Sequence, residues 1–145
     1  MNNAPVQAVN VRQVVPLLNV SDMAGSLAFY VDGLGFRMSN SWTPEGRLRW
    51  CWLTFGEASV MIQQSWDEAE GAIPTPQPAG GGVTMCLMCE DALAIWRKAR
   101  SRGLSPDQPF VGNGLWVVSF RDPDGYRLDF ESPTDVPEDT RYQGD

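Results

Sequence analysis

The side chains that most often carry chemistry in proteins are sparse in this chain. Histidine is absent from all 145 residues, which removes the most common general base and a common metal ligand. The three cysteines include one Cys-x-x-Cys pair, Cys86 and Cys89. This pair lies in an apolar run of strand character, whereas a redox thiol is activated at the start of a helix. We therefore expect Cys51, Cys86 and Cys89 to be buried, reduced thiols.

The remaining candidates for catalysis lack partners in the sequence. Ser59 and Cys86 have no neighbour that is identifiable as an activating base. A carboxylate could act as a base only if burial raised its pKa, and the sequence does not show burial. No catalytic residue is therefore identified from the sequence.

Charge and hydropathy narrow the class of partner. The formal net charge is −7, which disfavours binding to a phosphate backbone and is compatible with a cationic ligand. The longest apolar runs, such as residues 14–18, are far too short to span a bilayer. No basic start followed by an apolar core suggests secretion. We expect a cytoplasmic protein that binds neither nucleic acid nor membranes.

Hydrophobic periodicity predicts one β-α-β-β-β series that occurs twice. Helix positions are indicated by apolar spacings of three and four, and Gly56-Glu57 has the form of a two-residue hairpin loop. The first series is expected as a strand 11–20, a helix from Asp22 to Gly33 or Gly35, and strands 36–42, 47–55 and 58–64. The second is expected as a strand 83–89, a helix from Glu90 or Asp91 to Gly103, a strand at Phe110, and strands 115–121 and 126–131.

The length and this duplication predict one domain spanning residues 1–145. A loose leader, residues 1–10, precedes the first module. The expected parts are a first module at about 11–64, a linker or flap at 65–82, a second module at about 83–132, and a polar tail at 133–145. The linker is distinguished by three prolines and the run Gly80–Gly82.

Two motifs in these modules resemble a known superfamily. Residues 20–30, followed by Leu34-Gly35-Phe36, resemble the V-x-D-x-x-x-S-x-x-F-Y…L-G-F opening of the glyoxalase/bleomycin-resistance/dioxygenase (vicinal oxygen chelate) superfamily. Residues 120–128 resemble its closing F-x-D-P-D-G-x-x-L. The resemblance implies an α+β fold in which two tandem βαβββ modules form a curved mixed sheet around a cleft. It also implies a homodimer, sometimes with exchanged modules.

The resemblance further implies where a metal would bind. Metal-using members place His, Glu or Gln on the first and last strands of each module. Counting from the motifs, these positions hold Val15, Gln63, Thr84 and Asp129. Val15 cannot coordinate, Thr84 is a poor ligand, and a dioxygenase iron centre needs two histidines. We expect no metal and no cofactor, although the oxygens of Gln63 and Asp129 could hold Mg²⁺ loosely with waters.

Strand alternation predicts what lines the cleft instead. Pairing across Gly56-Glu57 places Cys51, Leu53 and Phe55 under the helices, so their neighbours along the strand face the other way. The same parity applies to the strands at 83–89 and 126–131. Indole faces can stack on a ligand, and carboxylates can pair with a cation. The candidate ligand-binding residues are Trp50, Trp52, Met61, Gln63, Thr84, Met88, Asp129 and Glu131.

Three functions remain open on this evidence. The leading hypothesis is a metal-free protein, closest in character to bleomycin-resistance-type proteins, that sequesters a cationic or aromatic, antibiotic-like small molecule. The second is a lyase, isomerase or epimerase that acts on a small oxygenated metabolite through Gln63, Asp129 or Glu131. The third is an interaction module whose surface serves only dimerisation.

Overall fold

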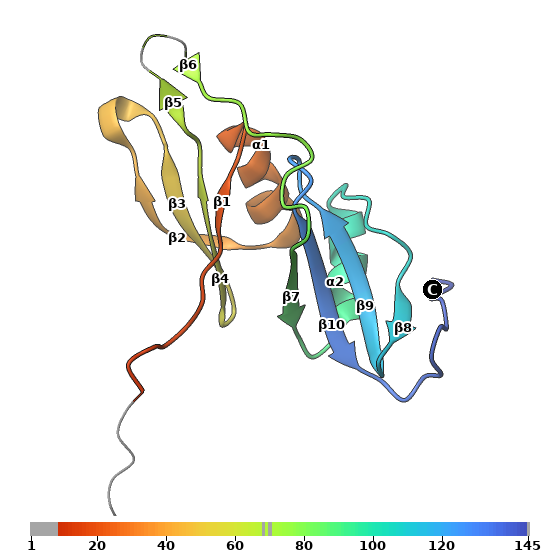
Figure 1. Cartoon of the computed structure of the whole chain (residues 1–145). Coiled ribbons are helices and arrows are strands. Elements are labelled where there is room, and N and C mark those ends of the chain that lie inside the picture. Colours follow the sequence, from red (N-terminus) through yellow and green to blue (C-terminus); the bar gives the residue numbers. More distant parts are fainter. Residues whose placement is uncertain (1–8, 68, 70, 145) are drawn as a thin grey trace, which may run out of the picture.

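Two four-stranded sheets, each with its own helix, make up the chain (Figure 1). The computed structural model describes residues 9–67, 69 and 71–144. The expected leader, residues 1–10, lies outside the described residues except for Val9 and Asn10, which are both exposed. No helix in the described ranges is long and apolar enough to cross a membrane.

The first module has the predicted β-α-β-β-β order. Its sheet runs β1-β4-β3-β2, with β1 parallel to β4 and the other pairs antiparallel. A short α-helix continues directly into a π-helical segment, and a 3₁₀ turn separates β2 from β3. The elements are β1 (Leu17–Asn19), α1 (Met23–Leu27), η1 (Ala28–Leu34), β2 (Arg37–Trp42), η2 (Pro44–Gly46), β3 (Trp50–Phe55) and β4 (Ala58–Gln63).

The second module repeats this topology, which confirms the predicted duplication. Its sheet runs β7-β10-β9-β8, with β7 parallel to β10. A two-stranded ribbon, β5 (Trp66–Asp67) and β6 (Gly71–Ala72), lies in the connection between the modules. The remaining elements are β7 (Thr84–Met88), α2 (Ala92–Ser101), β8 (Phe110–Gly112), β9 (Leu115–Arg121) and β10 (Arg127–Pro133).

Two local expectations need correction. The predicted strand 11–20 is wrong over its first six residues, because β1 begins at Leu17, where it meets β4. Asp22 occupies the N-cap position of α1, but its side chain accepts no capping hydrogen bond. Gln64 replaces it, because its Oε1 accepts from the Met23 amide at 2.9 Å. In the second module Asp91 caps as expected and accepts from the Ala94 amide at 3.1 Å.

Two glycines near the end of the first helix have different structural roles. Gly35 ends the helix with a φ of 101°, a left-handed conformation that other residues adopt at a cost. Gly33 lies inside the helix. A Cβ there would be 2.8 Å from the Leu104 Cδ1 atom, so the glycine allows the helix to approach the second module closely. The prediction that Gly33 could end the helix is therefore wrong.

The predicted alternation across the Gly56-Glu57 hairpin is confirmed. Phe55 pairs with Ala58, and Gly56 alone of the two loop residues has a positive φ, 59°. Cys51, Leu53, Val60 and Ile62 are at most 3% exposed and pack with the helix residues. Aromatic contacts continue this core into the second module, with ring centroids 6.4 Å apart for Phe29–Phe120 and 6.0 Å for Phe55–Phe130.

A buried pair of carboxylates in the turn 122–125 joins the two modules. Asp122 and Asp124 are 5% and 1% exposed. The Tyr30 hydroxyl donates to Asp122 Oδ2 at 2.8 Å, and the Ser21 amide and hydroxyl donate to Asp124. From the linker, Gln77 Nε2 donates to Asp124 Oδ1 at 2.7 Å. One turn of the second module therefore receives hydrogen bonds from the first module and from the linker.

We expect Tyr30→Phe to destabilise the protein by about 1–3 kcal/mol, because it leaves a buried carboxylate oxygen without its donor. Urea denaturation measures the free energy of unfolding. Tyr126→Phe is the matched control, since that hydroxyl donates to the Asn19 carbonyl at 2.9 Å in an exposed position and its loss should cost less. Equal losses in the two variants would contradict the role assigned to the buried bond.

The same variant has a pH signature. Burial raises the pKa of Asp122 above its ordinary 3.8, and the hydrogen bond from Tyr30 opposes that rise. A carboxyl with a raised folded pKa favours its protonated form, so stability falls as the pH rises through that pKa. Tyr30 stabilises the ionised form. The difference in the free energy of unfolding between wild type and Tyr30→Phe should therefore be largest at neutral pH. It should shrink as the pH is lowered and Asp122 becomes protonated, and a difference that does not change with pH would contradict this account.

Candidate functional site

The face of the first sheet opposite its helix is partly open to solvent in the described residues. Trp50, Trp52, Met61 and Gln63 are half-buried on this face, as the strand parity predicted. Gln63 pairs with Trp50 on one side and with Asn19 on the other, and its Nε2 donates to Asn19 Oδ1 at 2.7 Å. A row of polar and aromatic side chains thus crosses one end of the sheet.

Trp42 completes this row, although the sequence did not lead us to predict it as a site residue. It pairs with Trp50 at the end of β2 and is 58% exposed. A register shift lies between Met38 and Asn40 in the same strand pair. Because a one-residue shift changes which face a side chain occupies, the sequence alone could not place Trp42 beside Trp50.

A cavity of about 500 Å³ lies at this end of the sheet. It brings the predicted residues Trp50 and Gln63 together with side chains that sequence reasoning did not assign to a site. Its lining comes from β2, β3, β4, β5 and the start of the linker. The lining residues are Trp42, Arg49, Trp50, Gln63, Gln64, Ser65, Trp66 and Ile73.

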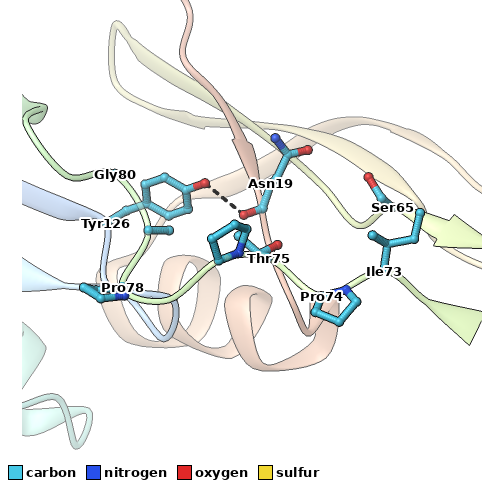
Figure 2. A pocket seen from close by; sticks show the side chains of 10 residues that line it. Asn19, Ser65, Ile73, Pro74, Thr75, Pro78, Gly80 and Tyr126 are labelled. Carbon is cyan, nitrogen blue, oxygen red and sulfur yellow. Dashed lines mark hydrogen bonds between the residues drawn. The ribbon is translucent and has the colours of Figure 1, made fainter.

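The linker forms the wall of a neighbouring cavity of about 430 Å³ (Figure 2). Ser65 and Ile73 line both cavities, so the two cavities adjoin. Figure 2 shows the linker passing beside Asn19 and Tyr126, whose hydroxyl bonds to the Asn19 carbonyl. Gly80 allows this approach, because a Cβ there would lie 2.6 Å from the Tyr126 ring. The part of the linker from residue 73 to residue 80 therefore lies against the modules and bounds this cavity.

Asp129, by contrast, is engaged within its own sheet. The residue is only 7% exposed, and Arg127 holds its carboxylate through Nε at 3.0 Å and Nη2 at 3.3 Å. The pKa of Arg127 is raised by this hydrogen-bonded carboxylate. Ser119 accepts a further bond from Arg127 Nη2 at 3.3 Å. The Asp129 carboxylate, which the sequence suggested as a partner for a cationic ligand, is therefore already neutralised by Arg127.

The other candidates of the second sheet lie along the edge strand β7 and on β10. Thr84 and the 64%-exposed Met88 line a second groove of about 500 Å³, between β7 and the start of β4. Glu131 is the register partner of Met88 and is half-buried. The eight candidates thus fall on two sheets, with Trp50 and Gln63 in one cavity and Thr84 and Met88 in another.

The expected metal positions are likewise divided between the sheets. Gln63 is bonded to Asn19 in the first sheet, and Asp129 to Arg127 in the second. Val15 is half-buried and Thr84 exposed. In the part of the chain that the structure describes, no three Cys, Asp or Glu side chains are grouped so that they could hold a metal ion.

The three cysteines are free, but they are not all buried. Cys51 lies in the core, and burial raises the pKa of its thiol to about 11. Cys89 is half-buried, with its pKa raised for the same reason. Cys86 is exposed, so the prediction of burial is wrong for this residue. The reason is that β7 is an edge strand and Cys86 faces away from the core.

Residues 11–130 match the family described as Glyoxalase/Bleomycin resistance protein/Dioxygenase superfamily. Comparison with curated protein sequences gives no match.

Solved structures with the same fold include three whose descriptions mention antibiotics. A bleomycin resistance determinant encoded on the transposon Tn5 has a TM-score of 0.65 and 22% identity, covering 87% of this chain and 100% of its own. A bleomycin-binding protein complexed with bleomycin has a TM-score of 0.63 and 22% identity, covering 84% and 98%. TnmS3, an antibiotic binding protein from Streptomyces sp. CB03234, has a TM-score of 0.63 and 21% identity, covering 88% and 100%. At these identities the likeness shows the fold.

Proposed function

The chain belongs to the glyoxalase/bleomycin resistance/dioxygenase superfamily, and from this premise we propose that it is a cytoplasmic small-molecule-binding protein that works without a metal ion. Relatives of the same fold that bind bleomycin or another antibiotic support a binding role. A bleomycin resistance determinant encoded on the transposon Tn5 has the same fold.

The cavity at the tryptophan-rich end of the first sheet carries this proposal. Its volume of about 500 Å³ lies within the range of about 300–1,000 Å³ that small-molecule sites usually have. Trp42 and Trp50 offer flat apolar faces there, and Gln63 offers an amide that can fix a ligand's orientation. This combination of stacking surfaces and polar side chains suits a flat aromatic, antibiotic-like compound that also carries polar groups.

The charge of that compound depends on the partners that remain available. Of the two carboxylates predicted to meet a cationic ligand, Asp129 is paired with Arg127, which leaves Glu131. Glu131 lies on the second sheet, away from the tryptophan cavity of the first. Stacking is therefore the main contribution that we propose for affinity.

A thermal-shift screen of flat aromatic compounds tests this function, because a ligand that prefers the folded state raises its stability. We expect Trp50→Ala to weaken the binding of a compound found this way by about tenfold, which corresponds to a stacking contribution of about 1–2 kcal/mol. Quenching of tryptophan fluorescence gives the dissociation constant.

Trp52→Ala is the matched control for this substitution. Trp52 lies on the same face two register pairs further along, where it pairs with Met61, and it is outside the residues that line the cavity. We expect a smaller loss of affinity than for Trp50→Ala. If both substitutions leave the affinity unchanged, the cavity is not the binding site.

Metal content separates this proposal from a metal-dependent lyase, isomerase or epimerase of the same superfamily. The implied metal positions hold Val15 and Thr84 beside Gln63 and Asp129, a set too poor in ligands to select an ion. We expect elemental analysis, after purification without chelators, to give far less than one transition-metal ion per chain. One tightly held ion per chain would contradict the proposal.

We also propose that the protein is a homodimer. Apolar side chains are exposed around the groove between the modules, including Val14 at 87%, Val83 at 66% and Met88 at 64%. A second copy of the chain would remove these side chains from water. Light scattering at micromolar concentration should give twice the chain mass of 16.0 kDa. A mass of one chain at that concentration would remove the dimer from the proposal.

A further inference from the structure

We propose that the tryptophan-rich end of the first sheet binds the acidic group of its ligand, so that the preferred ligand is a flat aromatic oxyanion, such as an aromatic carboxylate. The inference rests on the proposed small-molecule function and names its ligand class. The proposed ligand is an anion, whereas the acidic composition of the chain suggested a cationic ligand. The observation that carries it is a pair of arginines, Arg47 and Arg49, beside the tryptophans.

Arg49 is the central residue of this site. It lines the tryptophan cavity and also an adjoining polar cavity of about 390 Å³. Its Nε is buried and has no hydrogen-bond partner. A buried charged donor without an acceptor is costly. The Nε atom itself is closed to solvent, so a ligand oxygen would meet the accessible part of the half-buried Arg49 side chain, which lines both cavities, and would stabilise the positive charge there. Arg49 is held in place by its backbone, which bonds to Trp42 and to Gln64.

Arg47 adds a second positive charge to the same site. Its guanidinium lies 3.5 Å from the centre of the Trp66 ring, which is a cation–π stack. Stacking uses the face of the guanidinium and leaves the N–H groups at its edge free to donate. Trp66 lines both cavities, so the stack lies where the two cavities meet.

No internal carboxylate neutralises the two arginines in the part of the chain that the structure describes. Glu45 lines the polar cavity, but it is exposed and forms no ion pair with Arg47 or Arg49. The contrast is Arg127, whose charge is balanced by Asp129. The arginine pair is therefore available to an anion from outside the chain.

The net charge of −7 does not overrule this local arrangement. Charges in water are screened over about 8 Å at physiological ionic strength. Remote carboxylates therefore weaken the attraction of an anion less than the two adjacent guanidiniums strengthen it. Because Arg49, Trp42 and Trp50 line one cavity, a ligand whose oxyanion meets Arg49 can stack its ring on the indoles.

Three probes with one ring system and different charge test the inference by isothermal titration calorimetry. They are 2-naphthoate, its neutral methyl ester, and 2-naphthylmethylammonium. We expect the wild-type protein to bind the naphthoate about tenfold or more tightly than the ester, since charge-assisted hydrogen bonds are the stronger ones. The ammonium compound should bind most weakly. Added NaCl should weaken binding of the naphthoate and leave that of the ester unchanged.

Matched arginine variants then test which arginine side chains bind the carboxylate of the naphthoate. Arg49→Gln should bring the naphthoate and the ester to within about twofold of each other, and Arg47→Gln should reduce their ratio in part. Arg37→Gln, an exposed position at the far end of β2, should leave the ratio unchanged. If Arg49→Gln fails to fold, the wild-type ratio and the exposed Arg47→Gln variant decide the matter.

The outcomes separate this inference from the proposed function. Equal affinity for the three probes, or tightest binding of the ammonium compound, would overturn the oxyanion site while leaving aromatic binding intact. The same conclusion follows if the naphthoate binds best but Arg37→Gln lowers the ratio as much as the two site variants do. If none of the three naphthalenes binds, both the oxyanion site and the proposed aromatic binding are wrong.

Discussion

The hydrogen bonds that converge on Asp122 and Asp124 hold the two modules in one arrangement. Burying two carboxylates close together is unfavourable unless donors surround them, and here the donors come from Ser21, Tyr30 and Gln77. The turn can therefore reach its lowest energy only when the first module and the linker are both in place. Burial raises the pKa of Asp122 and of Tyr30, which keeps the tyrosine hydroxyl protonated as a donor. The aromatic contacts between the modules depend on the same alignment.

Once the helices cover one face of each sheet, the opposite faces are left to other partners. Edge strands and open faces explain why Trp42, Met88 and Cys86 are exposed in a chain with an otherwise continuous core. The linker then covers part of one open face, because it passes beside Asn19 and Tyr126 next to the first sheet (Figure 2). The tryptophan-lined cavity is thus a consequence of packing the core on one side only.

Local charge pairing decides what such a cavity can bind. The total charge of −7 suggested a cationic ligand, but a total says little about one site when screening confines each charge to its neighbourhood. Asp129 is balanced by Arg127 in the second sheet, whereas Arg49 has a buried nitrogen without an acceptor beside Trp50. The two sheets therefore differ in the kind of group that they can take from a ligand.

The sequence by itself determined the duplicated topology, the Gly56-Glu57 hairpin and the side of β3 on which Trp50 lies, because these depend on local turn chemistry and on the two-residue period of a strand. It could not determine the cavity. Trp42 pairs with Trp50 because the register of β2 shifts. Trp66 contacts Arg47 because part of the segment that we predicted as a linker or flap forms a two-stranded ribbon. The pairing of Asp129 with Arg127 and the isolation of Arg49 are likewise tertiary facts, since they depend on which side chains the folded chain brings within hydrogen-bonding distance.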